Sequence, residues 1–404
     1  MSEKENISPN LPVHTYLDLS FINNDATPGG NKKPVNMTYE EIRNSPYLLS
    51  PGQYFMSVVR WQCDTPSLPV WIPEVRLNQP LPNPFETIYS FTMAFNVGAV
   101  TIEVQTFITW FPQNQNTPPP IPPTTQQDLS SDFYYCYNYQ WWLKTLNTGL
   151  VSAFNNLNAA VIVAGGILPT TAYPFFRIDE TTKRLSLIAD ITAYDQANLL
   201  NPIRIFCNAP CYGMLSEFSF YRYGYDNIIN GKNFEFIIRS DIENNTQTFP
   251  VPANLVPPIP AYTGILVEAD GSNISSINPV ASIVFTTSFL PVLPANVSPP
   301  KVFASTSGFI QSGNNALTQN ILTDFIVPFS PDNTYRPTSN YNYQGEYRLI
   351  DLYGSTPLNS IFIECFWKDK YGGLHTLLME SGGSAQIKIL FRRADFNLTT
   401  ARLA

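Results

Sequence analysis

The residues of this chain that could carry out chemistry are few, and most stand alone in the sequence. His14 and His375, the two histidines, lie near opposite ends of the chain. Either could act as the base of a Ser–His–Asp site, but neither lies in a recognisable motif, and we interpret both as surface histidines. Cys207 and Cys211 are close enough in sequence to bind one metal ion together. Because zinc takes a tetrahedral set of ligands and no second Cys or His pair lies nearby, we interpret them as buried thiols.

Carboxylates and tryptophans give no stronger signal. Asp351, Glu364 and Glu380 could converge for acid–base chemistry, but we interpret them as parts of solvated strand faces. Trp141 and Trp142 could stack on a sugar, although Trp142 also fits the stripe of a helix, which favours a place in the core. The nucleophile elbow, the P-loop, the dinucleotide fingerprint and the paired-histidine zinc motif are absent from the sequence. The sequence therefore predicts no catalytic, cofactor-binding or metal-binding residue, and no enzyme.

The composition indicates a large core and a surface that needs partners. Of the 404 residues, 44% are hydrophobic, 14% are aromatic and 13% are charged. The charged share is about half of that in an ordinary soluble domain. A chain with so few charges and so many aromatics is expected to bury its sides against other subunits. The odd number of cysteines, five, and the absence of a signal peptide at the start predict reduced thiols in a cytosolic or nuclear setting.

Charge and hydropathy exclude two classes of partner. The net charge is −8 and no basic run lies at either end, so the sequence predicts no binding to nucleic acid. No apolar stretch approaches the roughly 18 residues that a membrane-spanning helix needs. The best candidate, residues 159–168, is too short and is interrupted by Gly165 and Gly166. We therefore expect no direct insertion into a membrane.

The elements that must build the fold are clearest near the end of the chain. Residues 347–396 read as four strands separated by turns, which predicts an antiparallel meander. Because side chains alternate across a strand, one face of each run must be buried. Two runs carry the clearest inward faces, namely Ile361, Ile363, Cys365 and Trp367, and Ala385, Ile387, Ile389 and Phe391. Such a meander needs a second sheet to pack against.

The upstream sequence supplies further strands and one helix. Residues 16–22 alternate as a strand, and residues 54–63 read as a strand buried on both faces. In the second strand the alternation places Phe55, Val59 and Trp61 on one face and Met56 and Val58 on the other. Within residues 133–157 the apolar side chains recur every three or four positions, which predicts an amphipathic helix with Asp132 as a plausible N-cap.

These elements predict an all-β fold, an antiparallel jelly-roll sandwich with an inserted helix and loops, or else two β modules. The proline-rich residues 250–260 are the best candidate for a domain boundary. We therefore expect an N-terminal arm and first strand in residues 1–34. A β-rich module with the long helix, at about 133–157, follows in residues 35–250. A C-terminal β module that ends in the meander takes up residues 264–404.

Several segments of the chain resemble a known family, the capsid proteins of Polinton (Maverick) elements and their viral relatives, the adintoviruses and virophages. These segments are YFMSVVRW (residues 54–61), LPVWIP (68–73), YYCYNYQW (134–141), LTDF (322–325), YRLIDL (347–352) and IKILFRR (387–393). The resemblance implies a jelly-roll virion protein without catalytic residues. It further implies the minor capsid (penton) protein, a homopentamer at the icosahedral vertices that contacts the major capsid protein. Its place would be the virion, assembled in the host cytoplasm or nucleus, and a host receptor is a further possible partner.

Three alternatives stay open at the level of sequence. The two halves around residues 250–260 each hold enough strands for a β domain, which suits a double jelly-roll major capsid protein that forms trimers. A sugar-binding β-sandwich module would use the many aromatics on one exposed concave face. A metalloenzyme of the cupin type would need a histidine cluster, and the two distant histidines, His14 and His375, argue against it.

Overall fold

The computed structural model describes most of the chain and divides it into two compact units. The described residues are 12–24, 33–76, 83–120, 131–179, 181–182, 184–226, 229–242, 246–249, 262–293, 295–297, 301–304, 308–311, 317–326, 338–342 and 348–394. Those of unit 1 lie in Met1–Leu68, Val280–Pro328 and Arg336–Ala404, and those of unit 2 lie in Pro69–Pro279. Unit 2 is thus inserted into one connection of unit 1.

This division differs from the one expected from the sequence. The boundaries between the units lie after Leu68 and after Pro279. The first strand and the C-terminal strands therefore belong to the same unit. The expected boundary at residues 250–260 lies outside the described residues. A local run of prolines marks a turn or a connector, whereas the units are defined by contacts between strands that are far apart in sequence.

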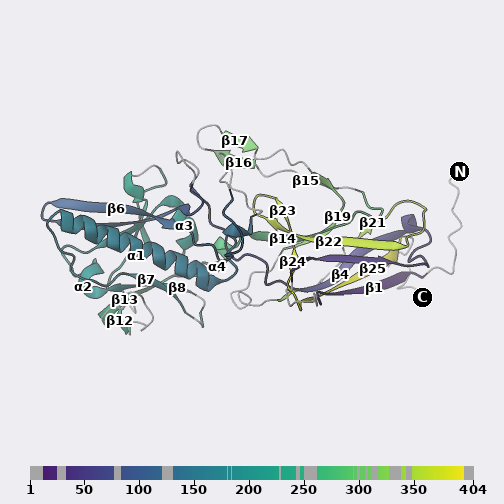
Figure 1. The fold of residues 1–404 in the computed structure, drawn as a ribbon, viewed down its shortest axis with the longest axis horizontal. Coiled ribbons are helices and arrows are strands. Elements are labelled where there is room, and N and C mark those ends of the chain that lie inside the picture. Colours follow the sequence, from purple (N-terminus) through teal and green to yellow (C-terminus); the bar gives the residue numbers. More distant parts are fainter. Residues whose placement is uncertain are drawn as a thin grey trace, which may run out of the picture. The chain divides into compact units, whose positions relative to one another are not determined.

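Unit 1 is an eight-stranded jelly roll, as its pairing shows (Figure 1). Its strands are β1 (His14–Ile22), β3 (Thr38–Ile42), β4 (Tyr54–Asp64), β14 (Val280–Thr286), β19 (Ile321–Ile326), β20 (Thr338–Asn342), β22 (Ser360–Asp369) and β25 (Ser384–Arg393). The first pairs with the last, the second with the seventh, the third with the sixth and the fourth with the fifth, all antiparallel. This nested hairpin is rolled up by two further pairs, β25 with β4 and β14 with β22. The result is two sheets, β1-β25-β4-β20 and β19-β14-β22-β3, the arrangement of a jelly roll.

Short strands extend these sheets or pair beside them. They are β2 (Val35–Asn36), β21 (Ile350–Asp351), β23 (Leu374–Thr376) and β24 (Leu378–Met379), together with β15 (Ala295–Val297), β16 (Lys301–Ala304), β17 (Gly308–Gln311) and β18 (Leu317–Gln319). β21 pairs with β4 and β23 pairs with β22. The pairs β2–β24, β15–β18 and β16–β17 form small ribbons of their own, and the 3-10 turn η1 (Pro51–Gln53) precedes β4.

The prediction that residues 347–396 form one meander is wrong, because these strands alternate between sheets. Only β22 and β23 pair there as a hairpin, whereas β21 and β25 lie in the sheet of β4. The turn at residues 381–383 leads into the ladder with β1 instead of reversing onto β24. The Gly382 N–H donates to the Asn23 carbonyl at 2.7 Å, and Gly382 takes a positive φ of 83° there. Local turn residues predicted a reversal but could not identify the partner strand.

The faces predicted for the two long C-terminal strands are those that build the core of unit 1. Ile361, Ile363, Cys365 and Trp367 of β22 and Ala385, Ile387, Ile389 and Phe391 of β25 are all buried. The two sheets meet through aromatic side chains between them. The Trp61 ring of β4 packs edge-on against Phe285 of β14 at 5.4 Å between centroids, and Phe325 of β19 completes the cluster. Burial of these large side chains is the main stabilising term of a sandwich.

A β-bulge in β4 corrects the predicted faces of that strand. Lys388 of β25 pairs with Arg60, but the next residue, Ile389, pairs with Val58, so Val59 has no opposite residue. An extra residue in a strand shifts the alternation of side chains by one. Trp61 is therefore buried on the same side as Met56 and Val58, and not with Val59 as the strict alternation predicted.

Unit 2 contains two sheets and the long helix α1 (Tyr139–Val163). One sheet has the order β10-β11-β9-β5-β6 and the other β12-β13-β8-β7. The strands are β5 (Glu86–Val97), β6 (Val100–Thr109), β7 (Phe175–Ile178), β8 (Leu185–Asp190), β9 (Arg204–Cys207), β10 (Phe220–Arg222), β11 (Phe234–Phe236), β12 (Thr246–Phe249) and β13 (Tyr262–Glu268). Shorter elements are η2 (Asp132–Tyr134), α2 (Ile191–Tyr194), α3 (Ala209–Leu215), η3 (Ile229–Gly231) and α4 (Ile274–Ile277). This pairing is not nested, so the described residues hold a single jelly roll, against the double jelly-roll alternative.

The helix is present but is displaced from its predicted bounds. Its predicted stripe is buried, from Trp142 through Leu150 to Leu157, and it packs against β5, β6 and β7. The N-cap is Asn138, whose side-chain oxygen accepts the Trp141 N–H at 2.8 Å, and not Asp132. Asp132 instead lies in a separate 3-10 turn. Within the described residues, neither this helix nor a shorter one has both the length and the apolar character needed to cross a membrane.

A pair of substitutions on adjacent residues of β25 tests the jelly-roll core. Ile389 is fully buried, so Ile389→Asp places an unpaired carboxylate among apolar side chains at a cost of several kcal/mol. That is comparable with the whole stability of a domain, about 5–15 kcal/mol, and we expect no folded protein. Lys388→Asp lies on the outer face, where the Lys388 side chain is 31% exposed, and should fold. Soluble yield and circular dichroism measure both, and equal folding of the two variants would show that the register is wrong.

Candidate functional site

The two histidines have different surroundings, and only one lies at the surface. His14 is exposed at the start of β1. The prediction of a surface residue is wrong for His375, whose side chain is 11% exposed. Its Nε2 lies 2.7 Å from Asp369 Oδ2, and its ring stacks on Trp367 at 4.1 Å between centroids. Oδ1 of Asp369 accepts the N–H groups of residues 371 and 373, so this pair fixes the turn between β22 and β23.

The five cysteines are free thiols, and all are buried. Cys207 lies on β9 and Cys211 on α3, as the interpretation of buried thiols required. Burial raises the pKa of Cys136 to about 12 and raises the pKa of Cys207 well above its ordinary value. Both are therefore neutral thiols at physiological pH, a poor state for a nucleophile or a metal ligand. Among the described residues no cluster of His, Cys, Asp or Glu has the arrangement of a metal site.

The other residues singled out in the sequence do not come together as one site. Asp351 is exposed on β21, in the sheet of β4, whereas Glu364 lies on β22 in the opposite sheet. Glu380 is exposed after β24. Trp142 is buried in the core of unit 2, and the Trp141 indole N–H donates to the Phe111 carbonyl at 2.7 Å.

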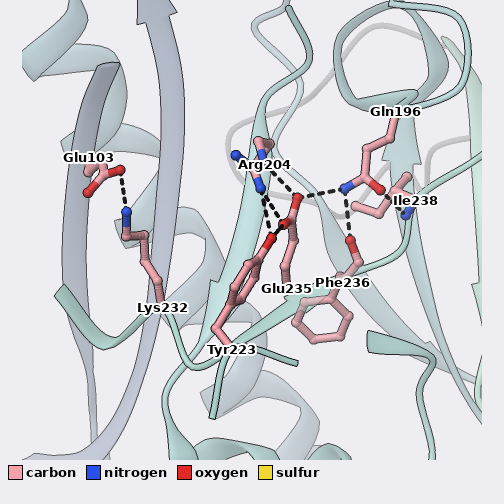
Figure 2. A network of polar contacts seen from close by, with 8 residues as sticks. All are labelled: Glu103, Gln196, Arg204, Tyr223, Lys232, Glu235, Phe236 and Ile238. Atoms are coloured by element: carbon pink, nitrogen blue, oxygen red, sulfur yellow. Dashed lines mark hydrogen bonds and ion pairs between the residues drawn. The ribbon is translucent and has the colours of Figure 1, made fainter. Parts of the chain in front are cut away.

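One polar cluster of unit 2 surrounds a buried carboxylate that the sequence did not single out (Figure 2). The side chain of Glu235 on β11 is 3% exposed, and three neighbours donate hydrogen bonds to it. Arg204 of β9 binds both carboxylate oxygens, with its Nε 2.6 Å from Oε1. The Tyr223 hydroxyl donates to Oε2 at 2.7 Å, and Gln196 Nε2 donates to Oε1 at 3.2 Å. Beside it, Lys232 pairs with Glu103 of β6.

This cluster links neighbouring strands of the sheet β10-β11-β9-β5-β6, and it has the chemistry of a structural ion pair. The hydrogen bond to the Glu235 carboxylate raises the pKa of the Arg204 guanidinium. The pKa of the Tyr223 phenol is also raised, mainly by burial and in second place by its hydrogen bond to the same carboxylate. Both groups therefore remain donors, and the buried charge is paired and hydrogen-bonded as its burial requires. The participants are scattered from Gln196 to Glu235, and no local spacing in the sequence could have revealed that they meet.

At one end of the jelly roll, several apolar side chains are exposed to solvent. Five residues, which we call the apolar rim, are between 51% and 72% exposed: Ile42, Leu49, Phe289, Leu293 and Tyr353. The end of β14 and the start of β22 meet there, where Phe289 contacts the Phe362 ring at 5.4 Å. The Tyr353 N–H donates to the Pro291 carbonyl at 2.9 Å, which joins the loop after β14 to the loop after β21.

Comparison with known proteins decides the class of this molecule. The family model for the Sputnik minor capsid protein V18/19 matches residues 15–393, nearly the whole chain. The chain belongs to this family. The structural protein V19 of Sputnik virophage is 27% identical over 216 residues, which cover 54% of this chain and 92% of V19. The uncharacterized protein V18 of the same virophage is 36% identical over 122 residues, which cover 29% of this chain and 70% of V18.

Two solved structures share the fold of this chain. A chain in the 3.5 Å cryo-EM structure of the Sputnik virophage is 26% identical, with a TM-score of 0.76 and coverage of 95% of this chain and 98% of that one. The mavirus penton protein has a TM-score of 0.56 at 14% identity, with 94% and 99% covered, which shows a shared fold. The protein is therefore a structural minor capsid protein of the virion. The resemblance to virophage capsid proteins and the all-β jelly-roll class predicted from the sequence are confirmed.

Thiol titration tests the burial of the cysteines. Because all five thiols are buried and burial raises the pKa of Cys63, Cys136, Cys207 and Cys365, the native protein should react with a disulfide reagent at pH 8 only over hours. In denaturant all five should react at once. Rapid release of one or more equivalents from the native protein would contradict this placement of the cysteines.

A matched pair of arginine substitutions tests the buried carboxylate. Arg204→Met removes the charged partner of Glu235, so we expect a loss of about 1.5–3 kcal/mol in the free energy of unfolding. Arg239→Met removes a similar pair with Asp241 that lies at the surface, where water screens the two charges, and it should leave the free energy of unfolding essentially unchanged. Urea unfolding followed by tryptophan fluorescence measures both, and equal losses would mean that burial of Glu235 has no energetic importance.

Proposed function

We propose that this chain is the penton protein of its virion, with five copies closing a ring at each icosahedral vertex and binding the surrounding major capsid protein. The observation that carries the proposal is the single jelly roll of unit 1, in a minor capsid family whose fold matches the mavirus penton protein along nearly the whole chain. A cyclic ring buries the same complementary contact in every subunit. A trimeric major capsid protein of the double jelly-roll type would need a second nested set of strands.

The apolar rim is the part of unit 1 best suited to contact a neighbouring subunit. Its five residues come from four separate loops or strand ends that converge on one end of the sandwich. Phe289 and Tyr353 are aromatic, and aromatic residues are enriched among those that dominate the binding energy of interfaces. Water contact with this surface is unfavourable at about 25 cal/mol per Å² of apolar area, so a subunit that covers it gains stability.

The remaining properties follow from the same role. The acidic net charge of −8 supports contacts with protein and not with nucleic acid, because a genome-binding capsid protein gains affinity from basic residues. We propose no catalytic activity, since the polar clusters around Glu235 and His375 tie strands and turns together. Recognition of a host receptor and assembly in the host cytoplasm or nucleus belong to the same proposal.

The mass of the assembly tests the proposed ring. Native mass spectrometry of the purified chain should give five copies, and Leu293→Asp should shift the population to monomers because it places a charge in the apolar rim. The control is Leu200→Asp, the same change at a leucine of unit 2 that is even more exposed, which should leave five copies. Three copies would favour the capsomer of a major capsid protein, and a soluble monomer at micromolar concentration would count against the ring.

A further inference from the structure

A second exposed apolar surface lies in unit 2, where three segments distant in sequence meet. It comprises the turn between β5 and β6, the end of α1 with the residues that follow it, and the loop after α2. Five aliphatic residues, which we call the apolar tip, are between 59% and 106% exposed: Val100, Ile162, Val163, Ile167 and Leu200. Within unit 2, the strand β6 and the helices α1 and α2 all reach the same end, which is drawn at the left in Figure 1.

Direct contacts hold the three segments of the apolar tip together. A Cβ on Gly166 would lie 2.8 Å from a methyl carbon of Val97, so the turn after α1 packs tightly against the β5–β6 hairpin. The Asn201 side chain donates to the Asn96 carbonyl at 2.9 Å and accepts the Asn96 N–H at 3.3 Å. These two bonds tie the loop after α2 to the same hairpin. The three segments of the tip are therefore in direct contact and form one surface.

The backbone that carries the tip residues at the end of α1 is held by hydrogen bonds. These side chains are therefore exposed from a folded segment. The N–H groups of Gly165 and Gly166 donate to the carbonyls of residues 162 and 161 at 2.9 Å, which closes the end of α1. Gly165 has a φ of +78°, the left-handed conformation that ends many helices. Val163 and Ile167, on either side of this turn, are 89% and 86% exposed.

The chemistry of the tip is purely aliphatic and uncharged. Residues 94–102, 145–176 and 196–203, which include all three segments, contain no Asp, Glu, Lys or Arg. The polar residues that flank the aliphatic ones are uncharged, and they include Asn96, Thr101 and Asn201. A solvent-exposed apolar surface with a polar border is a mark of an interaction site.

The composition of the tip favours a lipid surface over a protein partner. The energetic centre of a protein interface is enriched in Trp, Tyr and Arg, while Leu and Val are under-represented. The tip has five aliphatic residues, all of them Val, Ile or Leu. Lipid imposes no complementary shape, and each aliphatic side chain that enters the acyl region contributes on its own.

We propose that the apolar tip of unit 2 inserts into the interfacial layer of a lipid bilayer and so attaches the protein to membranes. This goes beyond the proposed assembly of vertices and does not depend on it. The expectation of no direct membrane insertion concerned continuous spanning segments, and a surface assembled from three separate loops leaves no such run in the sequence. Because the protein carries a net charge of −8 and the tip has no basic residue, attachment should need no anionic lipid.

Flotation of the full chain with vesicles tests the proposal. With neutral phosphatidylcholine vesicles we expect the wild type to float, with equal binding at low and at high salt. Ile167→Asp and Leu200→Asp should each lower the partition coefficient at least tenfold. The control Ile229→Asp makes the same change at an isoleucine of unit 2 that is 80% exposed outside the tip, and it should bind as the wild type does. Absence of wild-type binding, or equal binding by the tip variants, overturns the proposal.

A fluorescent label distinguishes insertion from mere adsorption. Because the five native cysteines are buried, the new thiol of Val163→Cys can be labelled selectively with an environment-sensitive dye. Vesicles should shift its emission to the blue, while the same dye at Ile229→Cys should not respond. Leu293→Asp, which should break the ring, should still bind vesicles, so the two proposals fail separately. If the tip variants change the copy number and no vesicle shift occurs, the tip is a protein contact and the lipid proposal is wrong.

Discussion

The pairing of the last strand with the first is the interaction on which the rest of this structure depends. β25 lies between β1 and β4, and it pairs with β1 along all nine residues from His14 to Ile22. Among the described residues no other strand pair joins segments so far apart in sequence over such a length. Its loop-closure entropy must be offset by the burial of Ile387, Ile389 and Phe391. Once this ladder is closed, the remaining strand pairs of the jelly roll are nested inside it.

The nested pairing also explains how the chain accommodates a large insertion. Residues 69–279 leave the jelly roll between its third and fourth strands, β4 and β14, and no pair of the nest is interrupted. Unit 2 can therefore carry its own core, built on α1 and on an aromatic cluster that includes Phe176, Phe218 and Phe236. Its buried ion pair, Glu235 with Arg204, stabilises its sheet independently of the jelly roll. This organisation gives each unit a core of its own.

Much of the local structure could be predicted from the sequence, and much of the topology could not. Alternation placed Ile363 and Trp367 in the core correctly, because side chains on one face of a strand share one environment. The same rule failed at Trp61, since the bulge at Val59 is set by the partner strand and leaves no trace in the residue pattern. The helix start was misplaced because both Asp132 and Asn138 are good N-cap residues, and only tertiary packing chose between them. The meander and the boundary at residues 250–260 were local interpretations of a fold whose contacts are long-range.

We propose that a single jelly roll with one inserted unit forms the vertices of the virion. A cryo-EM reconstruction of particles that contain this chain together with its major capsid protein tests this most directly. We expect five copies of the sandwich β1-β25-β4-β20 over β19-β14-β22-β3 around every five-fold axis, with the apolar rim covered by the neighbouring subunit. Density for this sandwich at the trimeric capsomers, or five-fold axes occupied by another protein, would contradict it.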